Sequence, residues 1–192
     1  MPDTALSQPA PSSLPLSPLN GRAPQLLDAA AASALVASYG AVSKGAALKD
    51  IGRIDPHMAR FIGLSPLCLV STADAAGKQD VTPRGDPPGS FKVLDEKTLA
   101  LCDRPGNNRL DTFTNIVETG RAGAIFLVPG VDEALRINGA ASLRNDEAYT
   151  SLCEVNGRFP KLVVHIAVKE AYLHCAKAIM RADLWQPEAK VE

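Results

Sequence analysis

Short apolar runs separated by turns constrain the fold of this chain more than any other feature. The runs are bounded by Gly, Pro, Asp and Asn, and they leave little room for helices between them. This order excludes a parallel βαβ architecture and predicts an antiparallel sheet, with about six strands, that closes or nearly closes into a barrel. The predicted strands cover residues 67–72, 79–84, 91–94, 98–102, 122–128, 134–143 and 161–173.

Helices are expected at the periphery of this sheet. An alanine-rich helix is predicted over residues 25–39 and a second short one over 46–51. A third helix is predicted to begin at Asp55-Pro56, an N-cap residue followed by proline at the first helical position. A fourth is predicted to follow Asn108, which we interpret as its N-cap. The fold class is therefore mainly β with peripheral helices.

The chain divides into a tail and one domain. Residues 1–24 are rich in Pro and Ser, lack the hydrophobic mass to fold, and lack the apolar stretch of a signal peptide. We predict a disordered tail there, N-terminal helices packed on the barrel at 25–64, and a barrel domain at 65–187. A length of 192 residues suits one such domain.

The composition excludes several classes of function. With 20 Lys+Arg against 21 Asp+Glu, no net field favours nucleic acid or an anionic membrane. No apolar run approaches the roughly 20 residues of a membrane span. The three histidines are scattered and the four cysteines form no C-x-x-C pair, so neither a metal site nor a structural disulfide is expected. These cysteines favour a reducing compartment, and we predict a cytoplasmic protein.

No catalytic residue can be assigned from a motif. The sequence contains no G-x-S-x-G elbow, no phosphate-binding P-loop and no G-x-G-x-x-G fingerprint. Acidic pairs such as Asp95-Glu96 and Asp132-Glu133 fall in predicted turns, where a solvated loop charge is the simpler interpretation.

Two blocks at predicted strand ends indicate an anion site. They run from Thr82 to Gly89 and from Asp103 to Arg109. The first amides of a helix are unsatisfied and carry partial positive charge, and guanidinium groups match phosphate oxygens. We therefore predict that one phosphate dianion is bound by these residues: Arg84, Arg104, Asn107, Asn108 and Arg109. The alternative for Arg104 is a loop ion pair with Asp103 or Asp86.

A segment near the C-terminus is also distinctive. Lys177 and Arg181 are four residues apart and would share one helical face, and Trp185 is the only tryptophan. By itself this segment is interpreted as a clasp on the core or on a second subunit.

These blocks resemble the pyridoxamine 5′-phosphate oxidase-like split-barrel flavoproteins, and most closely a bacterial branch of FMN-dependent enzymes with unassigned substrates. The resemblance extends in order from about Asp50 to Pro187. Its segments are residues 54–57, 64–66, 81–89, 103–111, 126–133, 135–139 and 174–178. The chain lacks the full phosphate-lysine pattern and the C-terminal arginine-histidine signature of the true oxidases, which argues against oxidation of vitamin B6.

The resemblance implies a six-stranded split barrel and a homodimer with flavin mononucleotide (FMN) at the subunit interface. It places the strand with Thr82, Pro83 and Arg84 along the cofactor and Arg136 on the interface strand. It also implies that Lys177, Arg181 and Trp185 approach the cofactor from the partner chain.

The function implied by the resemblance is that of an FMN-dependent oxidoreductase. The substrate is expected to be a small molecule, with NADH, NADPH or oxygen as a redox partner. Flavin supplies the redox chemistry while the protein binds and orients, which accounts for the lack of an acid-base motif. The alternative is a flavin-binding protein without turnover, used for storage or sensing.

Overall fold

The computed structural model describes residues 26–189, and the chain falls into two compact units. The first unit extends to Val42 and contains helix α1 (Ala29–Ser38), which buries none of its residues. The second unit begins at Ser43 and contains all the other elements. The predicted tail over 1–24 lies outside the described residues, and the predicted boundary between residues 64 and 65 stays a prediction.

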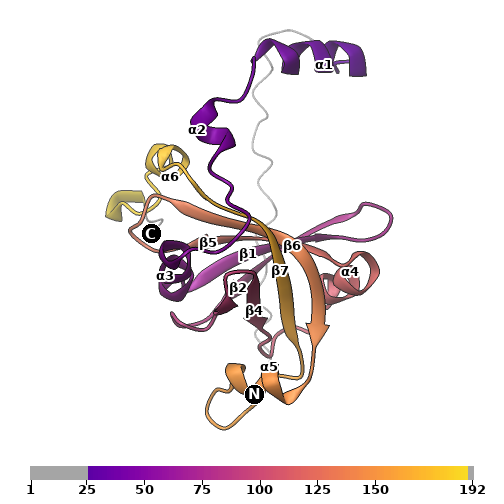
Figure 1. Ribbon diagram of the computed structural model, residues 1–192, viewed down its shortest axis with the longest axis vertical. Helices are drawn as coiled ribbons and strands as arrows, with labels where there is room; N and C mark the ends of the chain where they lie inside the picture. The colour runs from indigo at the N-terminus through magenta and orange to yellow at the C-terminus, as the bar shows by residue number, and fades with distance from the viewer. Residues whose placement is uncertain (1–25, 190–192) are drawn as a thin grey trace, which may run out of the picture. The chain divides into compact units, whose positions relative to one another are not determined.

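One antiparallel sheet of seven strands forms the second unit. In space the strands follow the order β2-β1-β5-β6-β7-β4-β3, and the sheet curls strongly upon itself (Figure 1). The strands are β1 (Leu67–Ala73), β2 (Gln79–Gly85), β3 (Lys92–Asp95), β4 (Thr98–Cys102), β5 (Arg121–Leu127), β6 (Ala134–Arg144) and β7 (Val163–His174). The predicted mainly β class with a split barrel is confirmed. The sheet has seven strands, one for each predicted range, whereas the family resemblance implied six.

The helices lie around this sheet. They are α2 (Lys44–Ala47), α3 (Pro56–Leu64), α4 (Asp111–Thr119), α5 (Glu147–Thr150) and α6 (Lys177–Arg181), with 3-10 turns η1 (Ser151–Cys153) and η2 (Pro187–Ala189). Helix α3 begins as predicted, because the Asp55 carboxylate accepts a hydrogen bond of 2.8 Å from the amide of Met58. Its Met58 and Ile62 are buried in the core.

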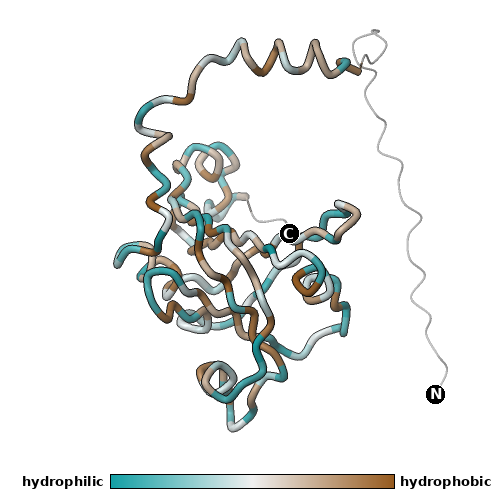
Figure 2. The backbone as a smooth tube through the Cα atoms, turned by 45° about the vertical axis from the view of Figure 1, so that its right-hand side comes forward, coloured by the Kyte–Doolittle hydropathy of each residue, from teal (hydrophilic) through white to brown (hydrophobic). Residues whose placement is uncertain are grey.

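Alternation along the strands sends one set of side chains into the core. Hydrophobic and hydrophilic residues alternate along much of the backbone (Figure 2). On β5, Ala122, Ala124 and Phe126 are buried while their neighbours are partly exposed, as a period of two requires. The largest fully buried side chains of the sheet include Phe126, Leu135 and Ile137.

A disulfide joins Cys102, at the end of β4, to Cys153 in η1. The prediction that the chain has no structural disulfide is therefore wrong. The sequence did not suggest this pair, because 51 positions separate the two residues and only the fold brings their Cα atoms to 5.5 Å. Cys68 is buried and Cys175 exposed, and both are free thiols.

No helix among residues 26–189 has the length and apolar character needed to cross a membrane.

Candidate functional site

Two ion pairs cross the space between the ends of β2 and β4. Arg84, on β2, donates to Asp103 just beyond β4 at 3.0 Å. In the reverse sense, Arg104 beyond β4 donates through Nε to Asp86 beyond β2. The two strands are not neighbours in the sheet, so these side-chain pairs link them where no backbone pairing does. The alternative prediction for Arg104, a loop ion pair with Asp86, is therefore confirmed.

The guanidinium of Arg84 also lies over the ring of Phe113, 5.1 Å from its centroid. Phe113 is in the first turn of α4 and is buried in the core. This cation–π contact fixes the planar face of Arg84 and leaves its edge to Asp103. Arg84 is paired in the sheet with Cys68 of β1. Burial raises the pKa of the Cys68 thiol to about 12, and the charge of Arg84 lowers this pKa by a smaller amount. Cys68 is thus unreactive.

Helix α4 begins two residues later than predicted. Its N-cap is Leu110 without a side-chain cap, whereas Asn108 adopts a left-handed conformation at φ 59°. The N-cap assignment of Asn108 is therefore wrong. Asn side chains tolerate this conformation, and the residue serves the turn that precedes the helix. Among the described residues nothing accepts a hydrogen bond from the amide of Thr112, so the first turn of α4 retains an open donor.

Arg109 stands beside this open turn. Its Nε donates to Asp111 at 2.6 Å and its amide donates to the side chain of Asn107 at 3.0 Å. The hydrogen bond from Arg109 lowers the pKa of Asp111 below its usual range. The side chain of Arg109 is 77% exposed, and its terminal nitrogens have no acceptor within residues 26–189. They remain available to an anion from solvent.

Buried polar contacts hold α4 against the β1–β2 hairpin. Thr112 donates from its hydroxyl to Asp80 at 2.8 Å, and Asn115 donates to the hydroxyl of Thr72 at 2.9 Å. Thr72, Thr112 and Asn115 are all buried, so these bonds are made away from water and fix the helix start in place. Asp80 and Asp111 also add negative charge that an incoming phosphate has to outcompete.

The other predicted cofactor residues are distributed over the sheet and α6. Thr82 and Pro83 lie on the edge strand β2. On β6, Arg136 donates to the hydroxyl of Tyr172 at 2.6 Å. Lys177 and Arg181 both lie on α6, where the Arg181 Nε donates to the Lys177 carbonyl.

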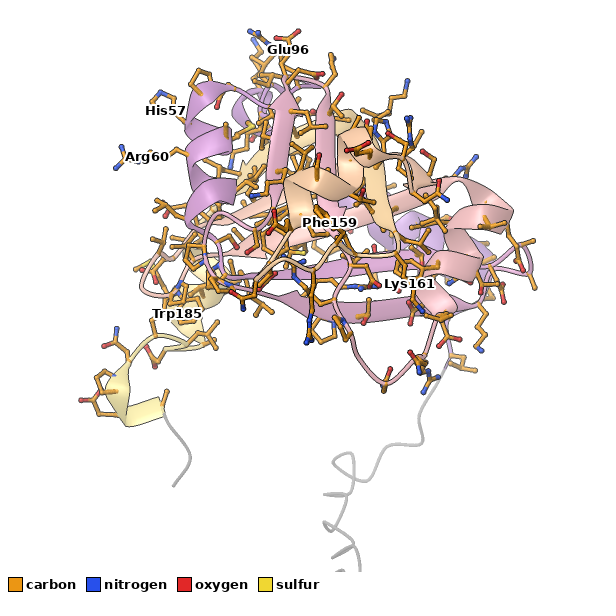
Figure 3. All side chains as sticks on the ribbon, turned by 90° about the horizontal axis from the view of Figure 1, so that it is seen from below. His57, Arg60, Glu96, Phe159, Lys161 and Trp185 are labelled. Atoms are coloured by element: carbon orange, nitrogen blue, oxygen red, sulfur yellow. A yellow bond between two sulfur atoms is a disulfide. The ribbon has the colours of Figure 1, made fainter. Side chains whose placement is uncertain are left out.

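Trp185 follows α6, and its indole donates to the carbonyl of Val131 at 2.9 Å. It lies well apart from Phe159 and Lys161, which follow η1 and precede β7 (Figure 3). Within one subunit the structure therefore brings Arg84, Arg104 and the start of α4 together. It does not bring Trp185 close to Phe159 and Lys161, which belong to the same connection between β6 and β7 as Cys153, a contact of Arg104.

Within residues 26–189, the cavity at the arginine site is small. It is lined by Arg84, Asp103, Thr112 and Phe113 and has a volume of about 10 Å³, the size of one water molecule. A groove of about 910 Å³ lies elsewhere, along the β1–β2 hairpin and across β5, β6 and β7. A ligand much larger than water at the arginine site must therefore lie on the surface of a single chain.

Sequence reasoning missed two contributors to this site. The first is Cys153, whose carbonyl accepts a hydrogen bond of 2.8 Å from Arg104. The second is Phe113, in the first turn of α4, whose ring supports the guanidinium of Arg84. No local sequence signal indicates the role of Cys153. The role of Phe113 could have been predicted, because an aromatic residue in the first turn of a helix that follows an arginine-rich loop can stack against a guanidinium.

The connection from β6 to β7, residues 145–162, is called here the β6–β7 flap. It contains α5 and η1 and extends beyond one end of the sheet (Figure 1). Tyr149 in this flap hydrogen-bonds through its hydroxyl to Nδ1 of His165 on β7, at 2.8 Å. Arg144 lies over the ring of Tyr149, 4.5 Å from its centroid.

Acidification is expected to loosen the flap through His165. Burial lowers the pKa of His165 below its usual 6.5, with Arg144 adding to the lowering and Asp95 opposing it. The unfolded chain therefore binds a proton before the folded one does, and stability falls as the pH falls through about 6.5. Protection factors in residues 145–162, which divide out the base-catalysed intrinsic rate of amide exchange, should fall between pH 8 and pH 5. This loss of protection should be smaller in His165→Asn, and an equal loss in both proteins would contradict the assignment.

The curled antiparallel sheet is that of a split β-barrel. The family model for pyridoxamine 5′-phosphate oxidase matches residues 54–175, most of the second unit. The chain belongs to this family. No curated protein matches it.

Solved structures show the same fold. A variant of HupZ from Group A Streptococcus is 24% identical, with a TM-score of 0.53, and the match covers 63% of this chain and 99% of that one. A protein from Lactobacillus delbrueckii, provisionally described as a pyridoxamine 5′-phosphate oxidase, is 22% identical with a TM-score of 0.50. That match covers 65% of this chain and 99% of the other. At these identities the likeness establishes the fold alone.

Proposed function

We propose that this protein binds FMN, with the flavin phosphate at the start of α4. The observation that carries the proposal is the uncapped first turn of α4 beside the exposed terminal nitrogens of Arg109. A helix N-terminus and a guanidinium together form a ready site for a phosphate dianion. Arg84 and Arg104 are already paired with aspartates, so their role is to hold the loop and β2 in place around the phosphate.

A homodimer is part of the proposal, because a single chain does not enclose the cofactor. The outward face of β1 and β5 carries Leu67, Leu69, Ile125 and Leu127, which are only partly buried in one subunit. In the same register, Arg136 lies opposite Ile125 on the neighbouring strand β6. A second copy packed on this apolar face would cover it and supply the outer wall of the flavin site.

The proposed reaction is an oxidation or reduction of a small molecule. Bound FMN would accept and release the electrons. The residues of this chain bind the phosphate, orient the ribityl chain along Thr82 and Pro83, and limit the access of water. No side chain is assigned as an acid, a base or a nucleophile, and the substrate class remains a small organic molecule with NADH or NADPH as the donor.

The second candidate is a flavin-binding protein without turnover, for storage or sensing. It rests on the same contacts, since storage and turnover both require the flavin phosphate to be bound. Steady reduction of the bound flavin by NADH or NADPH, with reoxidation by an acceptor, supports the enzyme. Binding without reduction across a panel of donors supports storage.

Location in the cytoplasm is proposed with the same function. The even balance of charge and the two free thiols agree with it. The Cys102–Cys153 disulfide stands against it as a permanent structural bond, because such bonds are rare in reducing compartments.

Replacement of Arg109 by alanine tests the position of the phosphate. Loss of a charge-assisted hydrogen bond should weaken FMN binding, raising Kd roughly tenfold or more. Titration of the apoprotein with FMN, followed by flavin fluorescence, measures the change.

Arg53→Ala is the matched control for this experiment. Arg53 is also an exposed arginine in an ion pair, 2.9 Å from Glu96. Glu96 lies just before the start of β4, whereas the proposed phosphate site lies beyond the other end of that strand. FMN affinity should be unchanged in Arg53→Ala. Equal affinities for both variants and the parent protein would place the phosphate elsewhere.

A further inference from the structure

We propose that Cys102–Cys153 is a thiol–disulfide exchange site that latches the β6–β7 flap onto the end of β4. The reactant would be a small dithiol or a protein dithiol. The inference goes beyond the proposed function, although Arg104 connects the latch to the proposed FMN site.

The latch joins the flap to the candidate site at two adjacent points. Cys102 forms the disulfide, and two residues later Arg104 donates to the carbonyl of Cys153 at 2.8 Å. Arg104 is also paired with Asp86 beyond β2. The flap, β4 and the loop after β2 therefore meet at one arginine, so movement of Cys153 changes the position of Arg104.

Apart from the latch, the flap is held mainly by the Tyr149–His165 hydrogen bond and by the bond from Arg104 to Cys153. Three of its apolar side chains are exposed, with Leu152 at 39%, Val155 at 44% and Phe159 at 59%. The buried contact is a small cluster of Cys153 with Ala100 and Val163, against which Cys102 and Tyr149 pack. A segment with so few buried contacts opens at low free-energy cost once its covalent link is cut.

The environment of the two sulfurs favours directed attack. Cys102 is partly exposed whereas Cys153 is 1% exposed, so an incoming thiolate reaches Cys102 first. Attack on Cys102 Sγ forms a mixed disulfide, breaks the bond to Cys153 Sγ and releases Cys153 as a thiolate.

The second thiol of the reductant completes the exchange. It attacks the reductant's own sulfur in the mixed disulfide, releases the Cys102 thiolate and leaves the reductant oxidised to a disulfide. The two cysteine thiolates take up the two protons that the reductant loses. In sum, one protein disulfide and one dithiol give two protein thiols and one reductant disulfide.

A disulfide that opens and closes by exchange is compatible with a reducing compartment. Cytosolic disulfides, where present, are usually transient and report the redox state. The reduced form has a mobile flap and a loosened Arg104, and the oxidised form has both fixed. FMN should therefore bind more tightly to the oxidised protein.

Hydrogen exchange on the full-length protein tests the latch without any ligand. The Cys175→Ser variant serves as the parent, because it removes the exposed free thiol. Treatment with dithiothreitol should raise the number of thiols titrated after denaturation from one to three, and should speed exchange at least tenfold in residues 145–162. Exchange in β1 and β5 should stay unchanged. Unchanged flap exchange in protein whose disulfide has been reduced would overturn the proposal.

Two further variants keep the test independent of folding defects and of FMN. Cys153→Ser in the same parent should show fast flap exchange with or without dithiothreitol, whereas Cys68→Ala should respond to reduction as the parent does. FMN affinity, measured in both redox states, should fall several-fold on reduction. If FMN binds neither state while flap exchange still responds, the proposed function fails and the latch stands. If FMN binds and flap exchange does not respond, the latch fails alone.

Discussion

Replacement of Phe113 by alanine is expected to destabilise the protein by about 3–5 kcal/mol, the usual cost of deleting a buried phenylalanine ring. Phe113 is 7% exposed and packs in the main core from the first turn of α4. Deletion of its ring leaves a cavity and also removes the surface on which the Arg84 guanidinium rests. Urea unfolding followed by circular dichroism measures the free energy of unfolding.

Val117→Ala is the control on the same helix. Val117 is 74% exposed, so its truncation should change the free energy of unfolding by no more than about 0.5 kcal/mol. A loss below about 1 kcal/mol in Phe113→Ala would mean that α4 does not pack on the sheet through this residue. The proposed phosphate site would then lose its fixed helix start.

Local signals in the sequence predicted much of the fold. Asp55-Pro56 predicts the start of α3 because the cap is formed by neighbouring residues, and the structure begins that helix at Pro56. The β1–β2 hairpin follows in the same way from a turn between two predicted strands. The start of α4 was misplaced, because Asn107 and Asn108 are equally suited to a cap and to a left-handed turn.

Non-local features were beyond such signals. Nothing in the sequence of β4 specifies that it pairs with β7, more than 60 residues along the chain, rather than only with its hairpin partner β3. The Cys102–Cys153 bond depends on that pairing, because it brings the end of β4 beside the flap that precedes β7. The crossed ion pairs depend likewise on the curl that brings β2 near β4.

The candidate site shows both cases together. Its residue types were predicted, since arginine and asparagine at a strand-to-helix junction suit a phosphate. The aspartate on each arginine was considered from sequence only for Arg104, because charge partners on different strands depend on register. The structure thus reduces the number of guanidinium groups with open donors, and it makes Arg109 the principal one.

Gly139→Ala is expected to destabilise the protein by about 3 kcal/mol, the upper part of the range for overpacking a core. Gly139 follows a register shift between β6 and β7, where the strands approach unusually closely. A Cβ atom at this position would stand 2.9 Å from Ile166 Cγ2 and closer still to the backbone carbonyl of Ala167. A carbonyl held in a ladder cannot rotate away as a flexible side chain does, so β6 and β7 must separate. Thermal unfolding and urea titration measure the loss.

Gly63→Ala separates this close approach from the general effect of removing a glycine. Gly63 lies in α3 with no atom within 4 Å of an added Cβ, so alanine there should stabilise the helix by about 0.5–1 kcal/mol.

The register shift at Gly139 also bears on the proposed dimer face. It lies next to Asn138 of β6, which donates to Glu170 of β7. Asn138 is two residues from Arg136, so both side chains are on the same, outward face of β6. Separation of β6 and β7 should therefore weaken self-association together with folding. An unchanged unfolding midpoint in Gly139→Ala would show that the two strands are not in contact there, and the register of the proposed interface would have to be redrawn.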